Sequence, residues 1–302
     1  MAESSDNYTN LVLMCEGNNR IFRAIDKRTG EKVVIKQMST KTEYNGFPSG
    51  IIREITALKS LNHPNIVQLR EVYFTEDNYL RLIFELMAAD LRFYLTKVKS
   101  IPLMLAKSYS YQLLCSVAYL HRKGIIHRGI VPHNILIDTK GFLKLAGFSL
   151  SRPFSIPESM ITPEVTYTFY RAPEALLDPT NYGTAADVWS VACVIGEMVS
   201  GKILFPGDSP IDQMMRVFNV IGTPTEEVWP GYSQLPNYID TLPVVMKTDL
   251  ASFFGINDDN FLDLMGQMLT HDPSKRITAI EALDHPFFES IPQQLIDICS
   301  PI

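Results

Sequence analysis

The sequence predicts an α+β fold with two lobes, a small β-rich lobe (residues 1–87) followed by a larger, mainly helical lobe (residues 88–302). Three observations predict it. Before residue 88, short apolar runs rich in Val and Ile alternate with turn signals, which is typical of strands. After residue 87, apolar residues recur at helical spacing. The length of 302 residues fits one large or two small domains, and a cleft between two lobes is a preferred ligand site.

The small lobe is expected to contain five strands and one helix. The predicted strands are Asn10–Met14, Arg20–Ile25, Lys32–Met38, Ile66–Phe74 and Tyr79–Leu86. The turn-rich segment Glu16–Asn19 joins the first two as a hairpin. Ile51, Ile55 and Leu58 fall at positions i, i+4 and i+7, which predicts a helix that runs to about Leu61.

The large lobe is expected to be built around a buried helix. Ala106–Leu120 has helical periodicity and few charges, so it is predicted to lie inside the lobe. Short strands and loops are expected to follow to about residue 172. From Asp187 onward the pattern is helical, with Pro-rich connections.

Composition excludes several classes of protein. With 46% apolar and 20% charged residues, the chain is not expected to be disordered, a coiled coil or collagen-like. No apolar run predicts a membrane span, and the polar, acidic start is not expected to be a signal peptide. The net charge of −6 argues against a nucleic-acid partner. Four separated cysteines without a CxxC pair indicate a reducing compartment, the cytoplasm or the nucleus.

Ten stretches, in one order and spacing over about Asn7–Phe288, carry a resemblance. They are VVIK (33–36), FPSGIIREI (47–55), LNHPNIVQL (61–69), IIHRGIVPHNILI (125–137), LKLAGFSLSR (143–152), YRAPE (170–174), ADVWS (186–190), LFPGDSPIDQ (204–213), IGTPTEEVWPG (221–231) and DPSKRITAIEALDHPFF (272–288). Together they resemble the eukaryotic protein kinases, and specifically the cyclin-dependent kinase family. The resemblance implies a bilobal kinase fold with an activation segment at about residues 147–174.

Several residues match nucleotide-binding positions of that family. In kinases a strand lysine holds phosphates and pairs with a helix glutamate, and here these residues are Lys36 and Glu54. The remaining matches form the adenine walls, the adenine-reading segment, the glycine-rich loop and a second metal position: Ile21, Val34, Leu136, Phe84, Glu85, Leu86, Met87, Glu16, Gly17 and Asn134. The alternative interpretation is solvated surface charge for the pair and ordinary core for the apolar residues.

The glycine-rich loop itself departs from the family pattern. Met14–Arg20 keeps one glycine and is one residue shorter than the pattern, and Asn18 and Asn19 stand where many relatives carry an inhibitory Thr-Tyr pair. Fewer glycines mean that fewer backbone N–H groups are expected to reach a phosphate closely.

Other matches concern folding and regulation. His127 and Phe148 match an apolar stack that joins the lobes, and Glu174 and Arg276 match a buried ion pair. Thr162 matches a phosphorylated threonine of the activation loop. Its expected partners are three arginines, which would order the loop through charge-assisted hydrogen bonds: Arg53, Arg128 and Arg152.

The reactive positions do not match. The family's catalytic-base aspartate is Gly129, the catalytic-loop lysine is Val131, and the magnesium-binding aspartate is Gly147. General-base catalysis contributes roughly 10²–10⁴-fold, and Mg²⁺ requires oxygen ligands. Asp90, Asp138 and Arg20 lie near the cleft but match none of the lost groups. We therefore expect no intact catalytic or metal site, ATP binding that is weak or independent of Mg²⁺, and poor Mg²⁺ binding.

The resulting expectation is a cyclin-dependent-kinase-like pseudokinase that acts as a cyclin-binding, scaffold or regulatory protein. Phe47–Ile55 resembles the cyclin-contacting helix, with Gly50 and Ile51 where Thr and Ala are usual. Leu204–Gln213 resembles a second docking region. Two alternatives remain open: an atypical serine/threonine kinase with residual activity, and a nucleotide-binding switch without catalysis.

Overall fold

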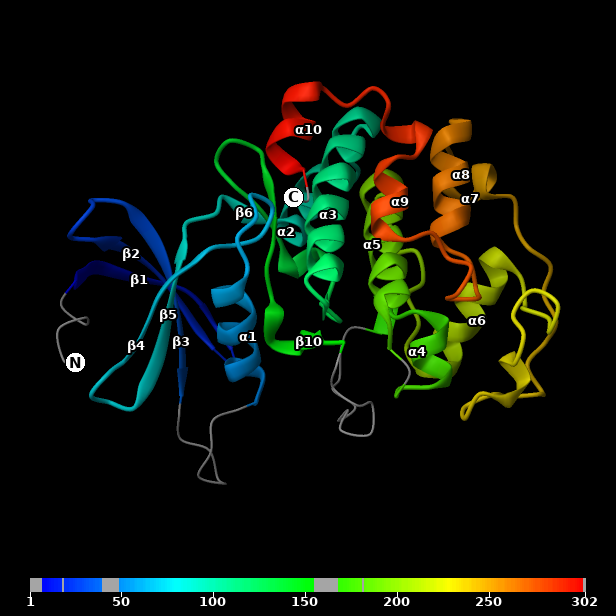
Figure 1. Cartoon of the computed structure of the whole chain (residues 1–302), viewed down its shortest axis with the longest axis horizontal. Helices are drawn as coiled ribbons and strands as arrows, with labels where there is room; N and C mark the ends of the chain where they lie inside the picture. Colours follow the sequence, from blue (N-terminus) through cyan, green and yellow to red (C-terminus); the bar gives the residue numbers. More distant parts are fainter. Residues whose placement is uncertain (1–6, 18, 40–48, 155–167, 181, 301–302) are drawn as a thin grey trace.

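The computed structural model describes residues 7–17, 19–39, 49–154, 168–180 and 182–300. The small lobe holds one antiparallel sheet in the order β1-β2-β3-β5-β4. Its strands are β1 (Tyr8–Glu16), β2 (Arg20–Asp26), β3 (Lys32–Ser39), β4 (Leu69–Phe74) and β5 (Tyr79–Glu85). One helix, α1 (Ser49–Ser60), lies beside this sheet on the side of the large lobe (Figure 1).

These elements confirm the five predicted strands and the single helix, with one boundary wrong. The strand predicted from Ile66 begins only at Leu69. Ile66 forms an isolated parallel bridge with Leu145, and the Val67 amide donates to the Leu145 carbonyl at 2.9 Å. Ile66 and Val67 are apolar because they lie buried against the large lobe. Their apolar character resembled that of a strand, so the predicted strand was too long.

The large lobe is mainly helical (Figure 1). Its helices are α2 (Leu91–Val98), α3 (Leu103–Arg122), α4 (Pro173–Leu177), α5 (Thr184–Ser200), α6 (Pro210–Ile221), α7 (Leu250–Phe254), α8 (Asp259–Met268), α9 (Ala279–Leu283) and α10 (Gln293–Cys299). Short strands are β6 (Ala89–Asp90), β7 (Ile125–Ile126), β8 (Ile135–Ile137), β9 (Leu143–Leu145) and β10 (Arg152–Pro153). Single 3₁₀ turns are η2 (Pro132–Asn134), η3 (Phe148–Leu150), η5 (Thr168–Tyr170), η6 (Tyr232–Gln234) and η7 (Pro286–Phe288).

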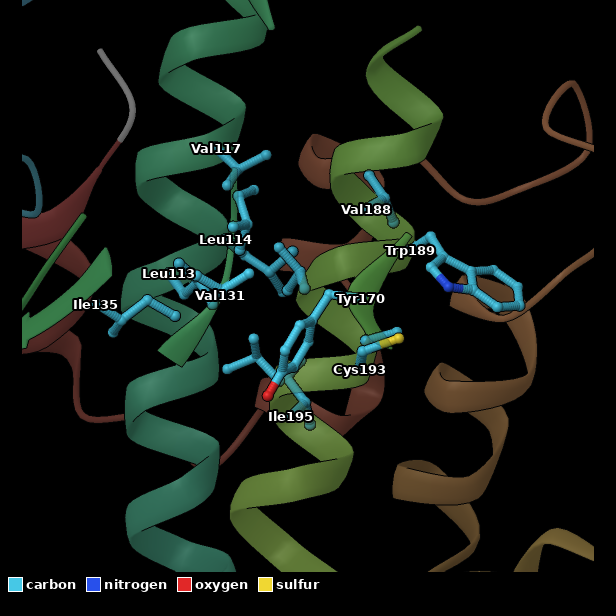
Figure 2. Close-up of a cluster of buried hydrophobic side chains, with 14 of the residues drawn as sticks. Leu113, Leu114, Val117, Val131, Ile135, Tyr170, Val188, Trp189, Cys193 and Ile195 are labelled. Atoms are coloured by element: carbon cyan, nitrogen blue, oxygen red, sulfur yellow. The ribbon is translucent and has the colours of Figure 1, made fainter. Parts of the chain in front are cut away.

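Helix α3 confirms the predicted buried helix. It packs against α5, and the apolar side chains between them form the centre of the lobe's core (Figure 2). Trp189 is fully buried on the side of α5 that faces away from α3 (Figure 2), where its ring stacks on Phe205. Two helices were missed: α2, whose N-cap Asp90 accepts the Phe93 amide at 2.7 Å, and the five-residue α4. Both are shorter than the window of about 11–18 residues in which helical periodicity is recognised in a sequence.

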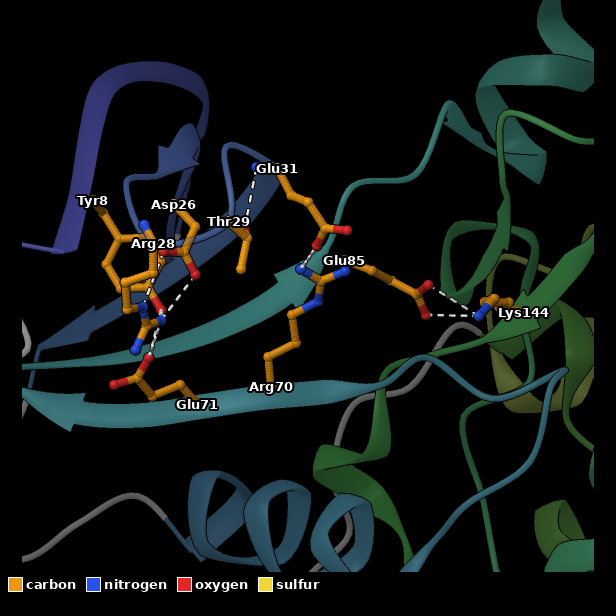
Figure 3. A network of polar contacts seen from close by, with 9 residues as sticks. All are labelled: Tyr8, Asp26, Arg28, Thr29, Glu31, Arg70, Glu71, Glu85 and Lys144. Carbon is orange, nitrogen blue, oxygen red and sulfur yellow. Dashed lines mark hydrogen bonds and ion pairs between the residues drawn. The ribbon is translucent and has the colours of Figure 1, made fainter.

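Ion pairs of buried and half-buried side chains connect separate segments within each lobe. In the large lobe, Arg276 Nη1 and Nη2 lie 2.6 and 2.9 Å from the two carboxylate oxygens of Glu174, so the predicted buried pair is formed. In the small lobe, Arg28 lies between Asp26 and Glu71, 2.9 Å from an oxygen of each, and links β2 to β4 (Figure 3). Among the described residues, no helix combines the length and apolar character needed to cross a membrane.

Candidate functional site

A cavity of about 670 Å³ lies between the lobes and contains most of the predicted nucleotide-binding positions. The predicted residues that line it are Ile21, Val34, Lys36, Glu54, Phe84, Glu85, Met87, Asn134, Leu136 and Gly147. β2 and β3 supply one wall, with Ile21 as the register partner of Lys36, and β8 supplies Leu136 opposite. Flat apolar walls of this kind suit an aromatic ring, with few polar groups to orient it.

Lys36 and Glu54 form the charged pair inside this cavity. Lys36 Nζ lies 2.6 Å from Glu54 Oε2, and the two side chains are 20% and 5% exposed. Strand β3 supplies the lysine and α1 the glutamate, so the pair fixes the helix against the sheet.

The side chain of Glu85 forms an ion pair beside the cavity. Its carboxylate accepts two hydrogen bonds from Lys144 Nζ, at 2.8 and 3.0 Å (Figure 3). This pair joins the end of β5 to β9 and therefore ties the small lobe to the large one beside the cavity.

Three predicted residues are not among those that line the cavity: Glu16, Gly17 and Leu86. Glu16 and Gly17 belong to the β1–β2 hairpin tip, where Glu16 Oε1 accepts from Arg20 Nε at 2.8 Å. Both side chains of this pair are half exposed. Arg20, which was expected near the cleft, is therefore engaged within the hairpin.

Sequence matching missed nine residues that line the cavity: Met14, Cys15, Val67, Ala88, Ala89, Asp90, Phe93, His133 and Ala146. Most of them lie within three residues of a matched residue, so closeness to a matched motif is the sequence feature that could have identified them. Phe93 is different, because it lies on α2, which the periodicity did not reveal.

The frame of the catalytic-loop segment is formed by buried hydrogen bonds. The fully buried Asp187 accepts the main-chain N–H groups of His127 at 2.8 Å and Arg128 at 2.9 Å. These bonds hold Arg128 at φ +64°, a conformation that L-residues adopt rarely. The His127 ring packs edge-on against Phe148, with ring centroids 4.7 Å apart.

His127 is held in one tautomer. Its Nδ1 accepts the Gly129 amide at 3.2 Å, and its Nε2 lies 3.1 Å from the Ala146 carbonyl oxygen, to which it donates. Burial lowers the pKa of this imidazole below its ordinary value, so the ring is neutral and keeps this arrangement. The folding role expected of His127 and Phe148 therefore has a geometric basis.

The positions of the missing groups differ in the space around them. A Cβ added to Gly129 would meet its nearest atom, Leu150 Cδ1, at 3.5 Å, which is ordinary contact. A Cβ added to Gly147 would lie only 2.3 Å from Asn134 Cγ, and Gly147 has φ +81°. Asn134 Nδ2 donates to the Gly129 carbonyl at 2.8 Å. The Asn134 amide therefore occupies the space beside Gly147.

Val131 does not face the cavity. Its side chain is 4% exposed and belongs to the apolar core, in the same cluster as Leu113, Leu114 and Tyr170 (Figure 2). A side chain at this position points into the lobe, where valine is accommodated and an ammonium group would lose its hydration.

The residues of the cavity do not fit a magnesium ion. Gly147 provides no oxygen, and Asn134 is neutral. The acids in and near the cavity are already engaged: Glu54 pairs with Lys36, Glu85 pairs with Lys144, Asp90 caps α2, and Asp138 accepts the amides of Lys140 and Phe142, both at 2.8 Å. Within the described ranges, no three His, Cys, Asp or Glu side chains are grouped as a metal site would require.

The predicted phosphothreonine site is described only in part. Thr162 lies outside the described residues, as does much of the 147–174 segment. Arg53 lies on α1 with Nη2 2.9 Å from Ser49 Oγ. Arg152 is the strand partner of Ile126 in the β7–β10 ladder, and Ile126 precedes Arg128 by two residues in the chain.

The small antiparallel sheet, the helical lobe and the lysine–glutamate pair in the cavity between them define the protein kinase class. The chain matches the family model described as protein kinase domain over residues 8–288. It therefore belongs to the protein kinase family.

Proposed function

We propose that this chain is a cyclin-dependent-kinase-like pseudokinase, a cyclin-binding or scaffold protein with little or no phosphoryl transfer. The observation that carries the proposal is the pair Gly129 and Gly147. Both stand in an intact frame, and neither supplies a carboxylate. The other acids that line the described cavity already have partners, Glu54 with Lys36, Glu85 with Lys144 and Asp90 with the Phe93 amide, and the nearby Asp138 accepts backbone amides.

A radiolabelled transfer assay tests the inactive assignment. The purified chain, with ATP, Mg²⁺ and generic serine/threonine substrates, is expected to give no more product than the Lys36→Met variant. Transfer by the parent chain that disappears in Lys36→Met would instead establish the atypical kinase, the alternative function.

ATP is proposed to bind weakly and without need of Mg²⁺. Support comes from the apolar walls and from Lys36, which is 20% exposed and so reachable by a phosphate. A thermal-shift titration with ATP, with and without Mg²⁺, is expected to give equal small increases in Tm. Lys36→Met should abolish them. No increase under either condition would leave a scaffold that does not bind nucleotide.

A cyclin or cyclin-like protein is proposed as the partner of the Phe47–Ile55 segment, of which residues 49–55 are described. Ile51 and Glu54 face inward, whereas Ile52 is 55% exposed on the outer face of α1. An exposed isoleucine on an otherwise docked helix suits an apolar partner surface.

A pull-down with purified cyclins measures this association. Ile52→Asp is expected to remove it, and Ile280→Asp is the matched control, because Ile280 is an equally exposed (55%) helical isoleucine on α9. Capture by no cyclin, or equal loss in both variants, would remove this partner class.

The Leu204–Gln213 segment is proposed as a second docking region. It borders a groove of about 400 Å³ whose lining is largely apolar: Leu176, Leu177, Ser209, Pro210, Ile211, Met214, Asn237, Tyr238, Ile239 and Leu242. Ile211 is 53% exposed at its edge. Ile211→Asp should weaken binding of a partner that survives Ile52→Asp, whereas Val228→Asp, at a residue 48% exposed, should not. A cytoplasmic or nuclear location remains part of this proposal.

A further inference from the structure

Two departures from the cyclin-dependent kinase pattern, Gly50 and Ser149, contact each other in the structure. Gly50 lies in the first turn of α1, and Ser149 lies in η3 directly after the cavity residue Gly147. A Cβ added to Gly50 would lie 3.3 Å from the Ser149 carbonyl oxygen and 3.4 Å from its Cβ. The family pattern has a larger residue at the position of Gly50 and glycine at the position of Ser149. In this chain the smaller residue is therefore on α1 and the larger one is on η3.

The contact belongs to the main docking surface of α1. This helix packs chiefly against η3, and Arg53 Nη1 adds a hydrogen bond to the Ser149 carbonyl at 3.4 Å. The neighbouring Phe148 is fully buried under it. A Cβ at residue 50 would be tighter than an ordinary contact, so α1 or the η3 main chain would have to shift by a few tenths of an ångström to admit a larger side chain.

The same surface determines where Glu54 lies. Gly50 and Glu54 are four residues apart on α1, so both lie on one face of the helix. Docking of the first turn on Ser149 sets the distance of that face from β3. Glu54 is 3% exposed and lies 2.6 Å from Lys36.

We propose that the Gly50–Ser149 contact is a positioning device that docks α1 in the isolated chain and so forms the Lys36–Glu54 pair without a partner. A cyclin would then add a surface to a helix already in place, rather than move it. This inference does not depend on whether the chain transfers phosphate, and the transfer assay above does not test it.

Hydrogen–deuterium exchange of the α1 amides in the purified full chain tests the device. The variants are Gly50→Thr, Gly50→Thr with Ser149→Gly, and the control Gly183→Thr. Gly183 is the N-cap of α5, has a negative φ, and has no atom within 4 Å of an added Cβ. Threonine at residue 50 has the higher intrinsic helix propensity, so faster exchange there would report undocking rather than a weaker helix.

Exchange of the α1 amides is expected to rise by about tenfold or more in Gly50→Thr, the scale that overpacking of a tight contact produces. Adding Ser149→Gly should bring it back to within about threefold of the parent chain. Gly183→Thr should leave α1 unchanged. The two tryptophans, Trp189 and Trp229, both lie in the large lobe, so their fluorescence verifies that each variant keeps that lobe folded.

The outcomes separate cleanly. Parent-like protection in Gly50→Thr would overturn the device. Faster exchange that Ser149→Gly does not reverse would also overturn it, since the damage would then not arise at this contact. A rise confined to α1 and reversed by the second substitution supports it.

Discussion

The two sides of the interlobe cavity differ in the side chains that they offer to a ligand. The side formed by the sheet and α1 keeps a reactive charge, because Lys36 is paired with Glu54 and still reachable. The opposite side keeps only its scaffold. There Asp187 holds the loop through the amides of His127 and Arg128, while Gly129 and Gly147, at which we propose that catalytic carboxylates are lost, provide no side-chain oxygen. Folding and chemistry are separable because backbone bonds and buried packing maintain the loop, whereas reactive side chains add little to stability.

The scaffold side gives the largest expected effect. Arg276→Met would leave the Glu174 carboxylate buried without its partner, since the two side chains are 0% and 4% exposed. Losing one member of such a pair costs about 3–5 kcal/mol. Urea unfolding followed by tryptophan fluorescence measures it. Arg216→Met, which breaks an exposed pair with Asp212, should change nothing measurable. Equal effects would mean that the buried pair does not hold the lobe together.

Acidic pH should lower the free energy of unfolding of the same lobe. Burial lowers the pKa of His271 to about 4 from 6.5. The unfolded chain therefore binds a proton that the folded chain excludes between these values, so stability falls as pH drops from about 6.5 towards 4 and is flat above it. The contribution is about 3 kcal/mol at most.

Unfolding free energies at pH 7 and pH 5 measure this effect. His271→Gln should reduce the difference between the two values, whatever it does to stability at pH 7. An unchanged difference would show that His271 is not the group that titrates.

The two missing carboxylates should differ when restored. Gly147→Asp places a side chain at φ +81° against Asn134, and the left-handed conformation alone costs about 1–2 kcal/mol. A Cβ at Gly129 meets its neighbours only at ordinary contact distances, so Gly129→Asp should cost less stability than Gly147→Asp, by about 1–2 kcal/mol. Thermal melts of the two variants compare them. A Gly147→Asp protein as stable as Gly129→Asp would show that Asn134 moves aside freely.

The smallest effect is expected at the hairpin tip. Arg20→Gln removes an ion pair with Glu16 whose side chains are 50% and 55% exposed, and such pairs contribute about 0.2–1 kcal/mol. Melting should barely change, and ATP-induced shifts should match those of the parent chain. A loss of the ATP shift would place Arg20 in the nucleotide site after all.

Prediction succeeded where the signal was local. The strands and helix α3 follow from periodicity, and most cavity residues follow from matched motifs. It failed where burial or brevity hid the pattern: Ile66 is buried without belonging to a strand, and α2, with its cavity residue Phe93, is too short. Nothing in the order of residues indicated that the Asn134 amide fills the space beside Gly147, because a rotamer depends on neighbours from other segments.

The order of residues already decides that carboxylates are missing at Gly129 and Gly147, since a glycine has none in any conformation. The distances between segments that are remote in the sequence are determined only by the tertiary structure. That Gly50 meets Ser149, and that Glu54 lies 2.6 Å from Lys36, is a result of how the helix packs on the lobes. Such contacts depend on tenths of an ångström in a close-packed interior, and no local pattern encodes them.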